Sequence, residues 1–395
     1  MKSALVLVAA LLSLSGRARD AEACGGCFAP PGPFTAVDGH RMVIALGVDE
    51  TVLWDQFLYS GAPEEFAWVL PVPASGALVE LADDAFVDRI DEATAPIVQP
   101  ASSDPCGGAA GGCDGFGGAG GPPPVAGVTV LQRSTVGPYE TVTLGAGDPD
   151  AMYTWLGYNG YAFPAEGVPA LDHYIERGSA FLVLRLRPGA GVSAMRPVRV
   201  RFRGFMGTFP LEMVTLGASG AVELSLWIIA EQRYAARNYP TVAIDPSQLV
   251  WDWADSTSNY DQVFEQTIDE SGGRAWVTEY AGVLAGTPLA QTLKQEAAAD
   301  YAAASRVGVP YLTRLRTRML VDHIDQDLEL VPAAEAGDVP RTLVAGQEIN
   351  PDCPASGMSV AGGERGGSPL AGLVLALAAA GLSAGRRRAA SRRRP

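Results

Sequence analysis

Five cysteines are the residues of this chain best suited to chemistry: Cys24, Cys27, Cys106, Cys113 and Cys353. A redox-active Cys-x-x-Cys pair needs its first thiol at the N-terminus of a helix. The seven residues after Cys27 are FAPPGPF, and their three prolines exclude a helix there. A zinc site could use the first four cysteines, but six residues separate the second pair, where two to four are usual. We therefore favour disulfide bonds, Cys106–Cys113 first, then Cys24–Cys27 or a link from that pair to Cys353.

Three histidines occur, His40, His173 and His323, and none belongs to a known catalytic motif. No Gly-x-Ser-x-Gly or His-Glu-x-x-His sequence is present, so a serine hydrolase triad and a zincin have no motif support. His40 is expected in a turn and His173 on a short helix. The acidic residues around His323 are interpreted as a solvated edge. No glycine motif for phosphates follows a strand, and no cofactor is expected.

The stretch DSTSNYDQVFEQ has oxygen-bearing side chains at the spacing of an EF-hand calcium loop. They are Asp255, Thr257, Asn259 and Asp261. Tyr260 stands where that loop needs glycine, and Gln266 stands where it needs a bidentate glutamate. We interpret the stretch as a loop in which Asn259 or Asp261 caps a helix, and we expect no metal.

Residues 1–23 are typical of a signal peptide. Lys2 precedes an apolar run, Ala4–Leu14, which is too short to span the ~30 Å hydrocarbon core as a helix. Ala21-Glu22-Ala23 has the small-x-small pattern of a cleavage site, and Gly16-Arg17-Ala18 is a second possible site. Cleavage after Ala23 makes Cys24 the first mature residue. Nine mostly polar or small residues separate the apolar run from Cys24, which argues against a lipid on that cysteine.

Residues 369–385 predict a short transmembrane helix, and 386–395 a basic cytoplasmic tail. Leu370–Gly385 contains sixteen residues without a charge, and six arginines follow. By the positive-inside rule the tail stays in the cytoplasm and the body lies outside, as the signal peptide also requires. The tail resembles bacterial sorting signals, in which a short motif precedes such a helix. Gly366-Gly367-Ser368 fits the glycine-glycine variety as a processing site, whereas the myxobacterial variety has a cysteine that is missing just before this helix.

The exported part is strongly acidic. Residues 24–368 contain 20 basic and 42 acidic side chains, a net charge of −22. This charge excludes nucleic acid as a partner, because no basic patch remains outside the tail. The expected partners are the membrane, through the C-terminal helix, and the export and sorting machinery. The sequence does not identify a binding partner in the cell envelope.

Patterning predicts an α+β fold with mixed, largely antiparallel sheets and several short helices. Residues 24–98 form a β-rich first part of the ectodomain and 128–334 an α+β second part. Between them, residues 99–127 are rich in glycine and proline and predict a loop or linker. Residues 335–368 contain mostly small residues and predict a flexible stalk to the membrane.

Individual elements follow from local patterns. DDAFVDRIDEATAP predicts a helix that Asp83 or Asp84 caps, GDPDAMYTWLGYNG predicts a helix with Pro149 in its first turn, and Pro288–Ser305 predicts another. YLTRLRTRMLVDHI is predicted to be helical or mixed. SAFLVLRLR, RPVRVRFRG, LEMVTLG and AVELSLWII alternate at period two and predict an antiparallel meander. On its polar faces we expect arginines paired with carboxylates on neighbouring strands: Arg185, Arg187, Arg199, Arg201 and Arg203.

Several blocks together resemble the bacterial family called domain of unknown function 2330. They are EEFAWVLPVP, VTVLQRSTVGPYE, NYDQVFEQTIDESGGRAWVTEYAG and YLTRLRTRM, and the resemblance covers about residues 24–332. The early Cys24-Gly25-Gly26 fits the family, although its second cysteine usually comes later than Cys27. The resemblance implies export and a shared fold but no catalytic residues. We expect a non-catalytic structural or binding module of the cell envelope, and the alternative is a periplasmic or surface enzyme, hydrolase-like, without a recognisable motif.

Overall fold

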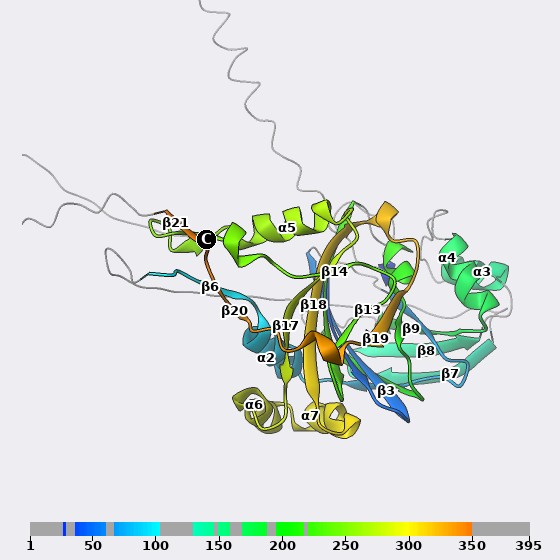
Figure 1. Ribbon diagram of the computed structural model, residues 1–395. Helices are drawn as coiled ribbons and strands as arrows, with labels where there is room; N and C mark the ends of the chain where they lie inside the picture. Colours follow the sequence, from blue (N-terminus) through cyan, green and yellow to red (C-terminus); the bar gives the residue numbers. More distant parts are fainter. Residues whose placement is uncertain are drawn as a thin grey trace, which may run out of the picture. The chain divides into compact units, whose positions relative to one another are not determined.

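The computed structural model (Figure 1) describes most of the chain before residue 350. The described residues are 27–28, 36–60, 67–102, 129–145, 149–158, 168–187, 195–216 and 220–349. Contacts divide the chain into two units, Met1–Asp352 and Cys353–Pro395, and every described residue belongs to the first.

The larger of two main sheets has the strand order β14-β17-β18-β12-β2-β3-β10-β5. Its strands are β2 (Ala36–Leu46), β3 (Glu50–Ser60), β5 (Leu78–Leu81), β10 (Val198–Arg203), β12 (Ala221–Ala230), β14 (Thr241–Val242), β17 (Trp276–Val283) and β18 (Tyr311–Leu320). Neighbouring strands are antiparallel, except that β2 is parallel to β12 and β14 to β17. The sheet therefore combines strands from both sides of the 99–127 segment.

The smaller sheet is antiparallel, with the order β1-β4-β9-β8-β7. Its strands are β1 (Cys27–Phe28), β4 (Ala67–Val72), β7 (Thr129–Val136), β8 (Tyr139–Gly145) and β9 (Ala180–Leu186). The two sheets share one apolar core, in which Ile44 and Leu226 of the larger sheet meet Leu70 and Leu184 of the smaller one, all buried. The sheets thus pack face to face, as apolar faces of two sheets do.

Helices cover the outer faces of both sheets. They are α2 (Asp84–Thr94), α3 (Pro149–Tyr158), α4 (Val168–Glu176), α5 (Tyr260–Glu270), α6 (Pro288–Glu296) and α7 (Ala298–Ala304). Helices α3 and α4 pack on the smaller sheet, α2, α6 and α7 pack on the larger sheet, and α5 packs near β17 and β18 (Figure 1). The α2 helix begins where Asp83 accepts a hydrogen bond from the backbone N–H of Ala85, as its sequence predicts. The predicted α+β class is confirmed.

Short elements complete the described part. The strands are β6 (Ile97–Gln99), β11 (Thr208–Phe209), β13 (Tyr234–Ala236), β15 (Val250–Asp252), β16 (Thr257–Ser258), β19 (Leu328–Pro332), β20 (Thr342–Val344) and β21 (Gln347–Ile349). The 3-10 turns are Leu211–Leu216, Pro246–Gln248, Ser305–Val307, Val321–His323 and Ala334–Ala336. The last two strands differ from the predicted stalk, because β20 pairs with β6 and β21 with β15. Strands of three residues are too short for a pattern to indicate them.

Several local predictions are wrong. The segment predicted as helical or mixed forms strand β18 followed by the 3-10 turn Val321–His323; its arginines fall at every second position, and the strand lies between β17 and β12. LEMVTL is not a strand but a 3-10 turn. The predicted helix at Pro288–Ser305 is broken at Ala297, whose φ of −140° and ψ of 50° are not helical. The predicted meander is divided, since β9 belongs to the smaller sheet and β10 and β12 to the larger one.

The predicted pairing of strand arginines with carboxylates is confirmed for three of them. The guanidinium of Arg185 lies 2.6 Å from the carboxylate of Glu140, its partner in the β8–β9 register. The guanidiniums of Arg199 and Arg201 contact carboxylates at 2.7 Å. Arg201 contacts Glu50 on the neighbouring strand β3. The 2.7 Å partner of Arg199 is Asp300 on α7, whereas its cross-strand partner is Glu80 on β5, at 3.2 Å. These arginines balance charge within and beside the sheets.

The predicted signal peptide, the glycine-rich segment from residue 103 and the sorting tail lie outside the described residues. So do Ala23, Cys24, Cys106, Cys113, Cys353 and the processing motif Gly366-Gly367-Ser368. Cys27 is described only as a backbone position in β1, so the disulfide pairing remains a prediction. Within the described segments, no helix has both the length and the apolarity needed to cross a membrane.

Candidate functional site

A polar cleft of about 610 Å³ opens on the helix-covered face of the larger sheet. Its floor comes from β2, β12 and β18, and its walls come from α2 with the following turn and from the start of α5. The lining residues are His40, Arg41, Asp91, Ala95, Pro96, Val98, Glu223, Ser225, Ser258, Tyr260, Asp261, Arg314 and Arg316. Most of these side chains are polar or charged.

Strand register explains why the floor residues meet. Ser225 on β12 pairs with Arg41 on the parallel neighbour β2 and with Arg316 on the antiparallel neighbour β18. Side chains of paired residues point to the same face of a sheet, so these three form a row across the cleft floor. One row further along, Arg314 pairs with Trp227.

A β-bulge supplies the carboxylate beneath this row. The register between β17 and β18 shifts between Thr278 and Tyr280, which makes Glu279 the additional residue. A bulge redirects the side chain of its additional residue. Here it places the carboxylate of Glu279 against Arg314 and Arg316, with no exposed side-chain surface.

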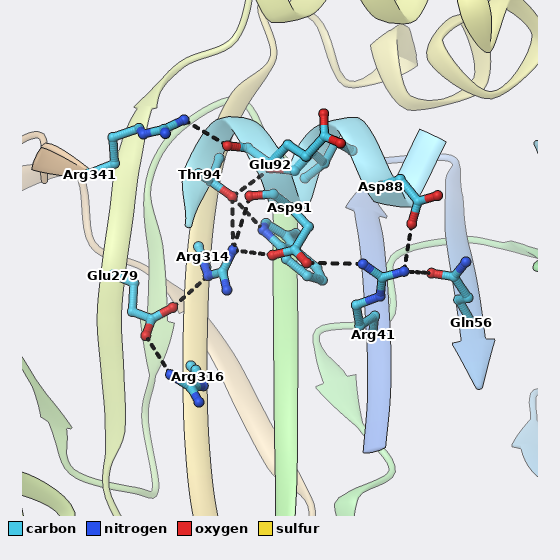
Figure 2. A network of polar contacts seen from close by, with 12 residues as sticks. Arg41, Gln56, Asp88, Asp91, Glu92, Thr94, Glu279, Arg314, Arg316 and Arg341 are labelled. Carbon is cyan, nitrogen blue, oxygen red and sulfur yellow. Dashed lines mark hydrogen bonds and ion pairs between the residues drawn. The ribbon is translucent and has the colours of Figure 1, made fainter. Parts of the chain in front are cut away.

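Two carboxylates link the three arginines into one network (Figure 2). Asp91 accepts hydrogen bonds from Nη1 of Arg41 at 3.0 Å and from Nη1 of Arg314 at 2.6 Å. Glu279 accepts from Nε of Arg314 at 2.5 Å and, more weakly, from Nη1 of Arg316 at 3.5 Å. Two positive charges thus compensate the burial of Glu279.

Aromatic rings hold the two inner guanidiniums in place. Cζ of Arg314 lies 4.9 Å from the ring centre of Trp227, and Cζ of Arg316 lies 4.3 Å from that of Phe264. Such contacts between a cation and a ring face are attractive and restrict the guanidinium plane. Tyr260 donates a hydrogen bond to Glu279 at 2.8 Å, and burial, followed by the charge of Glu279, raises the pKa of Tyr260 above its ordinary value. Tyr260 therefore stays a hydrogen-bond donor at neutral pH.

The network leaves specific atoms without partners. Within the described residues, Nη2 of Arg314 makes no hydrogen bond or ion pair, although only 7% of this side chain is exposed. Nε of Arg41 is buried and likewise unpartnered in this part of the chain. On the acceptor side, Asp261 is 84% exposed and its ion pair is a 3.5 Å contact with Nη1 of Arg316. The cleft can therefore both donate to and accept from a ligand.

The histidines do not join this cleft as catalysts. His40 lies in strand β2 and not in a turn, it is 3% exposed, and its Nδ1 is 2.9 Å from Oδ1 of Asp55. Its register partner on β12 is Leu224, so its ring faces the core between the sheets, where a cavity of about 20 Å³ adjoins it. The side chain of Ser225 faces the other way, and a Ser-His-Asp triad is not formed.

His173 and His323 make structural contacts elsewhere. Nδ1 of His173 is 3.1 Å from a carboxylate oxygen of Glu212, and Nδ1 of His323 donates to the carbonyl of Gly273 at 3.1 Å. The prediction of a solvated acidic edge near His323 is wrong for Asp327. This residue is 7% exposed and accepts a hydrogen bond from Tyr174. Burial raises the pKa of Asp327, whereas its hydrogen bond from Tyr174 lowers it.

The calcium-like stretch forms the loop before α5, as predicted, but the predicted side-chain cap is not formed. Asn259 precedes α5 without a side-chain cap bond, and its Oδ1 instead accepts from the backbone N–H of Val250 at 2.7 Å. Across the described ranges, no group of three or more acidic, histidine or cysteine side chains is arranged to hold a metal ion. Three residues of the stretch line the cleft: Ser258, Tyr260 and Asp261.

A larger hollow of about 860 Å³ lies at the opposite end of β2 and β18. Its lining includes the turn residues Gly47–Glu50, Phe205 and Arg306. Its described side chains form no buried network, so it is the weaker candidate.

Motif searching missed all five central residues: Arg41, Asp91, Glu279, Arg314 and Arg316. One signal was available, because the alternating arginines of TRLRTRM place Arg314 and Arg316 on a single strand face. No local pattern indicates that Asp91 and Glu279, from distant segments, complete the network.

Comparison with known proteins gives one match. A family model described as "Uncharacterized protein conserved in bacteria (DUF2330)" matches residues 18–331. No curated protein and no solved structure matches the chain. The match covers most of the chain, including every residue that lines the cleft, and the protein therefore belongs to the DUF2330 family of uncharacterised bacterial proteins.

Proposed function

We propose that this protein is a non-catalytic binding module of the bacterial cell envelope, and that it holds a small polar ligand in the cleft between α2 and α5. The sequence ends support the location: a signal peptide exports the chain, and residues 369–385 tether it with the ectodomain outside the cytoplasm. Processing near Gly366-Gly367-Ser368 would release the ectodomain to the surface.

One observation carries the binding function: the cleft floor contains a buried guanidinium, that of Arg314, whose Nη2 has no partner in the described structure. This Nη2 is not fully enclosed and faces the cleft, so a ligand can accept a charge-assisted hydrogen bond from it. Three aromatic or carboxylate contacts hold this guanidinium in place, from Trp227, Asp91 and Glu279, so its geometry exists before the ligand binds. Preorganised polar groups in a cleft of this size are typical of small-ligand sites.

The alternative, a hydrolase-like enzyme, fits the cleft less well. General acid–base catalysis needs a titratable group that can reach the reacting atoms. The ring of His40 faces the inter-sheet core, while Asp91 and Glu279 are occupied by the guanidiniums of Arg41 and Arg314. The described cleft residues therefore offer groups that can hydrogen-bond to a ligand more than they offer acids or bases that could transfer a proton to it.

The binding function is tested by blocking the cleft. Ser225→Trp adds bulk on the cleft floor, and Ser75→Trp adds the same bulk on an exposed turn outside the cleft. The full-length protein and both variants are incubated with small molecules extracted from the envelope of the bacterium that makes the protein. Compounds that stay bound are identified by mass spectrometry. We expect one compound to be retained by the wild type and Ser75→Trp but not by Ser225→Trp. Equal retention by a natively folded Ser225→Trp, or no retention by the wild type, contradicts the proposal.

The envelope location has its own test. Protease added to intact spheroplasts should digest the body and spare a tag after Pro395, because only the arginine-rich end is inside. A body that is protected from protease contradicts the location.

A further inference from the structure

The unpartnered atoms of the cleft indicate the charge pattern of its ligand. This step rests on the proposed function, namely that the cleft binds a small molecule. An accessible donor lies on the cleft floor and the most exposed carboxylate of the network, that of Asp261, lies at its rim, so we expect the two ends of the ligand to differ.

The deep end presents an accessible donor. Nη2 of Arg314 has no hydrogen bond or ion pair in the described structure, whereas Nε of Arg41 is unpartnered but buried; both guanidiniums contact the same carboxylate, that of Asp91. Asp91 has no further oxygen to offer, since Oδ1 serves Arg314 and Oδ2 serves Arg41. A ligand carboxylate supplies the missing acceptor, because guanidinium and carboxylate form short, charge-assisted hydrogen bonds.

The rim presents an acceptor. Asp261, in the first turn of α5, is 84% exposed, and its 3.5 Å contact with Arg316 is long for an ion pair. Arg316 is already held by Glu223 at 2.6 Å and by the ring of Phe264. Asp261 is therefore available to a ligand ammonium group.

The overall charge separates the remaining ligand classes. The three arginines contact five carboxylates: Asp88, Asp91, Glu223, Asp261 and Glu279. The cluster thus has two negative charges in excess, and the exported part of the chain is acidic as well. A simple anion is repelled by this field, and a simple cation leaves Nη2 of Arg314 unpaired. A zwitterion meets both requirements and adds no net charge.

We infer that the cleft binds a small zwitterion of the amino-acid type, an amino acid or a short peptide with both ends free. Its carboxylate accepts from Nη2 of Arg314 at the floor, and its ammonium donates to Asp261 at the rim. A volume of about 610 Å³ accommodates a molecule of this size. Ser225 and Ser258 line the cleft and supply hydroxyls that can bond to peptide groups between the two ends.

Calorimetry with glycine, diglycine and triglycine tests the ligand class on the full-length protein. These probes have the same two charged ends and differ only in the distance between them, so the tightest one reports the distance between floor and rim. The N-acetyl and C-terminal amide derivatives of that probe each lack one charge. We expect each derivative to bind at least about tenfold more weakly than the zwitterion.

Two variants on the same helix locate the ammonium end. Asp261→Asn should weaken the zwitterion about fivefold, because it removes one accessible ion pair, whereas the exposed Asp269→Asn should leave affinity unchanged. The amide derivative should lose affinity with Asp261→Asn in the same way, and the N-acetyl derivative should not.

Two results overturn the inference. One is an N-acetyl or amide derivative that binds as tightly as its zwitterion. The other is that no glycine probe binds, although Ser225→Trp still abolishes retention of the envelope compound. In that case the ligand class is wrong and the binding function stands. Loss of both signals removes the binding function itself.

Discussion

Glu279 is the residue on which the cleft network depends most, so Glu279→Gln is the most informative substitution. Its carboxylate is fully buried and accepts from Arg314 at 2.5 Å and from Tyr260 at 2.8 Å. Breaking a buried ion pair by neutralising one partner costs about 3–5 kcal/mol. Arg314 keeps its second carboxylate, Asp91, and glutamine retains one acceptor oxygen, so we expect the lower end, about 3 kcal/mol.

The assay is urea unfolding followed by tryptophan fluorescence, with the free energy of unfolding obtained from the midpoint at an unchanged slope. Glu223→Gln is the matched control. Glu223 contacts Arg316 at 2.6 Å but is 33% exposed, so its loss should cost less than about 1 kcal/mol. Glu279→Gln costing no more than Glu223→Gln would refute the view that this buried carboxylate holds the arginines in place.

Three further predictions follow from burial and from the chain ends. Burial raises the pKa of Asp327, so the folded protein favours the protonated carboxyl. The resulting contribution to the free energy of unfolding is complete below the ordinary pKa of about 3.9 and is lost as the pH rises through the raised pKa. The unfolding free energy of the wild type relative to Asp327→Asn should therefore fall as the pH rises above about 4, and a constant difference would contradict this. Phe86→Ala empties a site with 0% exposure under α2 and should cost about 3–5 kcal/mol in urea unfolding, against about 0.5 kcal/mol or less for Val48→Ala at 84% exposure. Intact-mass analysis should find a mature protein that begins at Cys24 and ends near Gly367, and an intact Pro395 on most molecules would make the helix a permanent anchor.

Elements with local start and stop signals were predictable. The cap at Asp83, the apolar spacing of α2 and the proline at the start of α3 each act within one turn of a helix, so the neighbouring sequence contains the whole signal. The carboxylate partners of strand arginines were predictable in kind, because a charged group on a sheet needs compensation wherever the sheet lies. The identity of each partner was not predictable.

Elements whose state depends on their neighbours were mispredicted. β18 has arginines that suit a helix as well as a strand, and its position between β12 and β17 decided the outcome. β20 and β21 are too short to be indicated by pattern and exist because β6 and β15 offer backbone partners. His40 was assigned to a turn because a glycine precedes it, although the irregularity there is a bulge within β2.

The sequence by itself determined the fold class and the acidic net charge, and it predicts targeting signals at both ends, because composition and short-range patterns carry that information. The tertiary structure alone decided the cleft. Asp91, Glu279 and Arg314 lie far apart in the chain, and they meet because α2 packs on the larger sheet and a bulge in β17 redirects one side chain. Such a site is a consequence of packing and register, which depend on contacts between segments that no local pattern records.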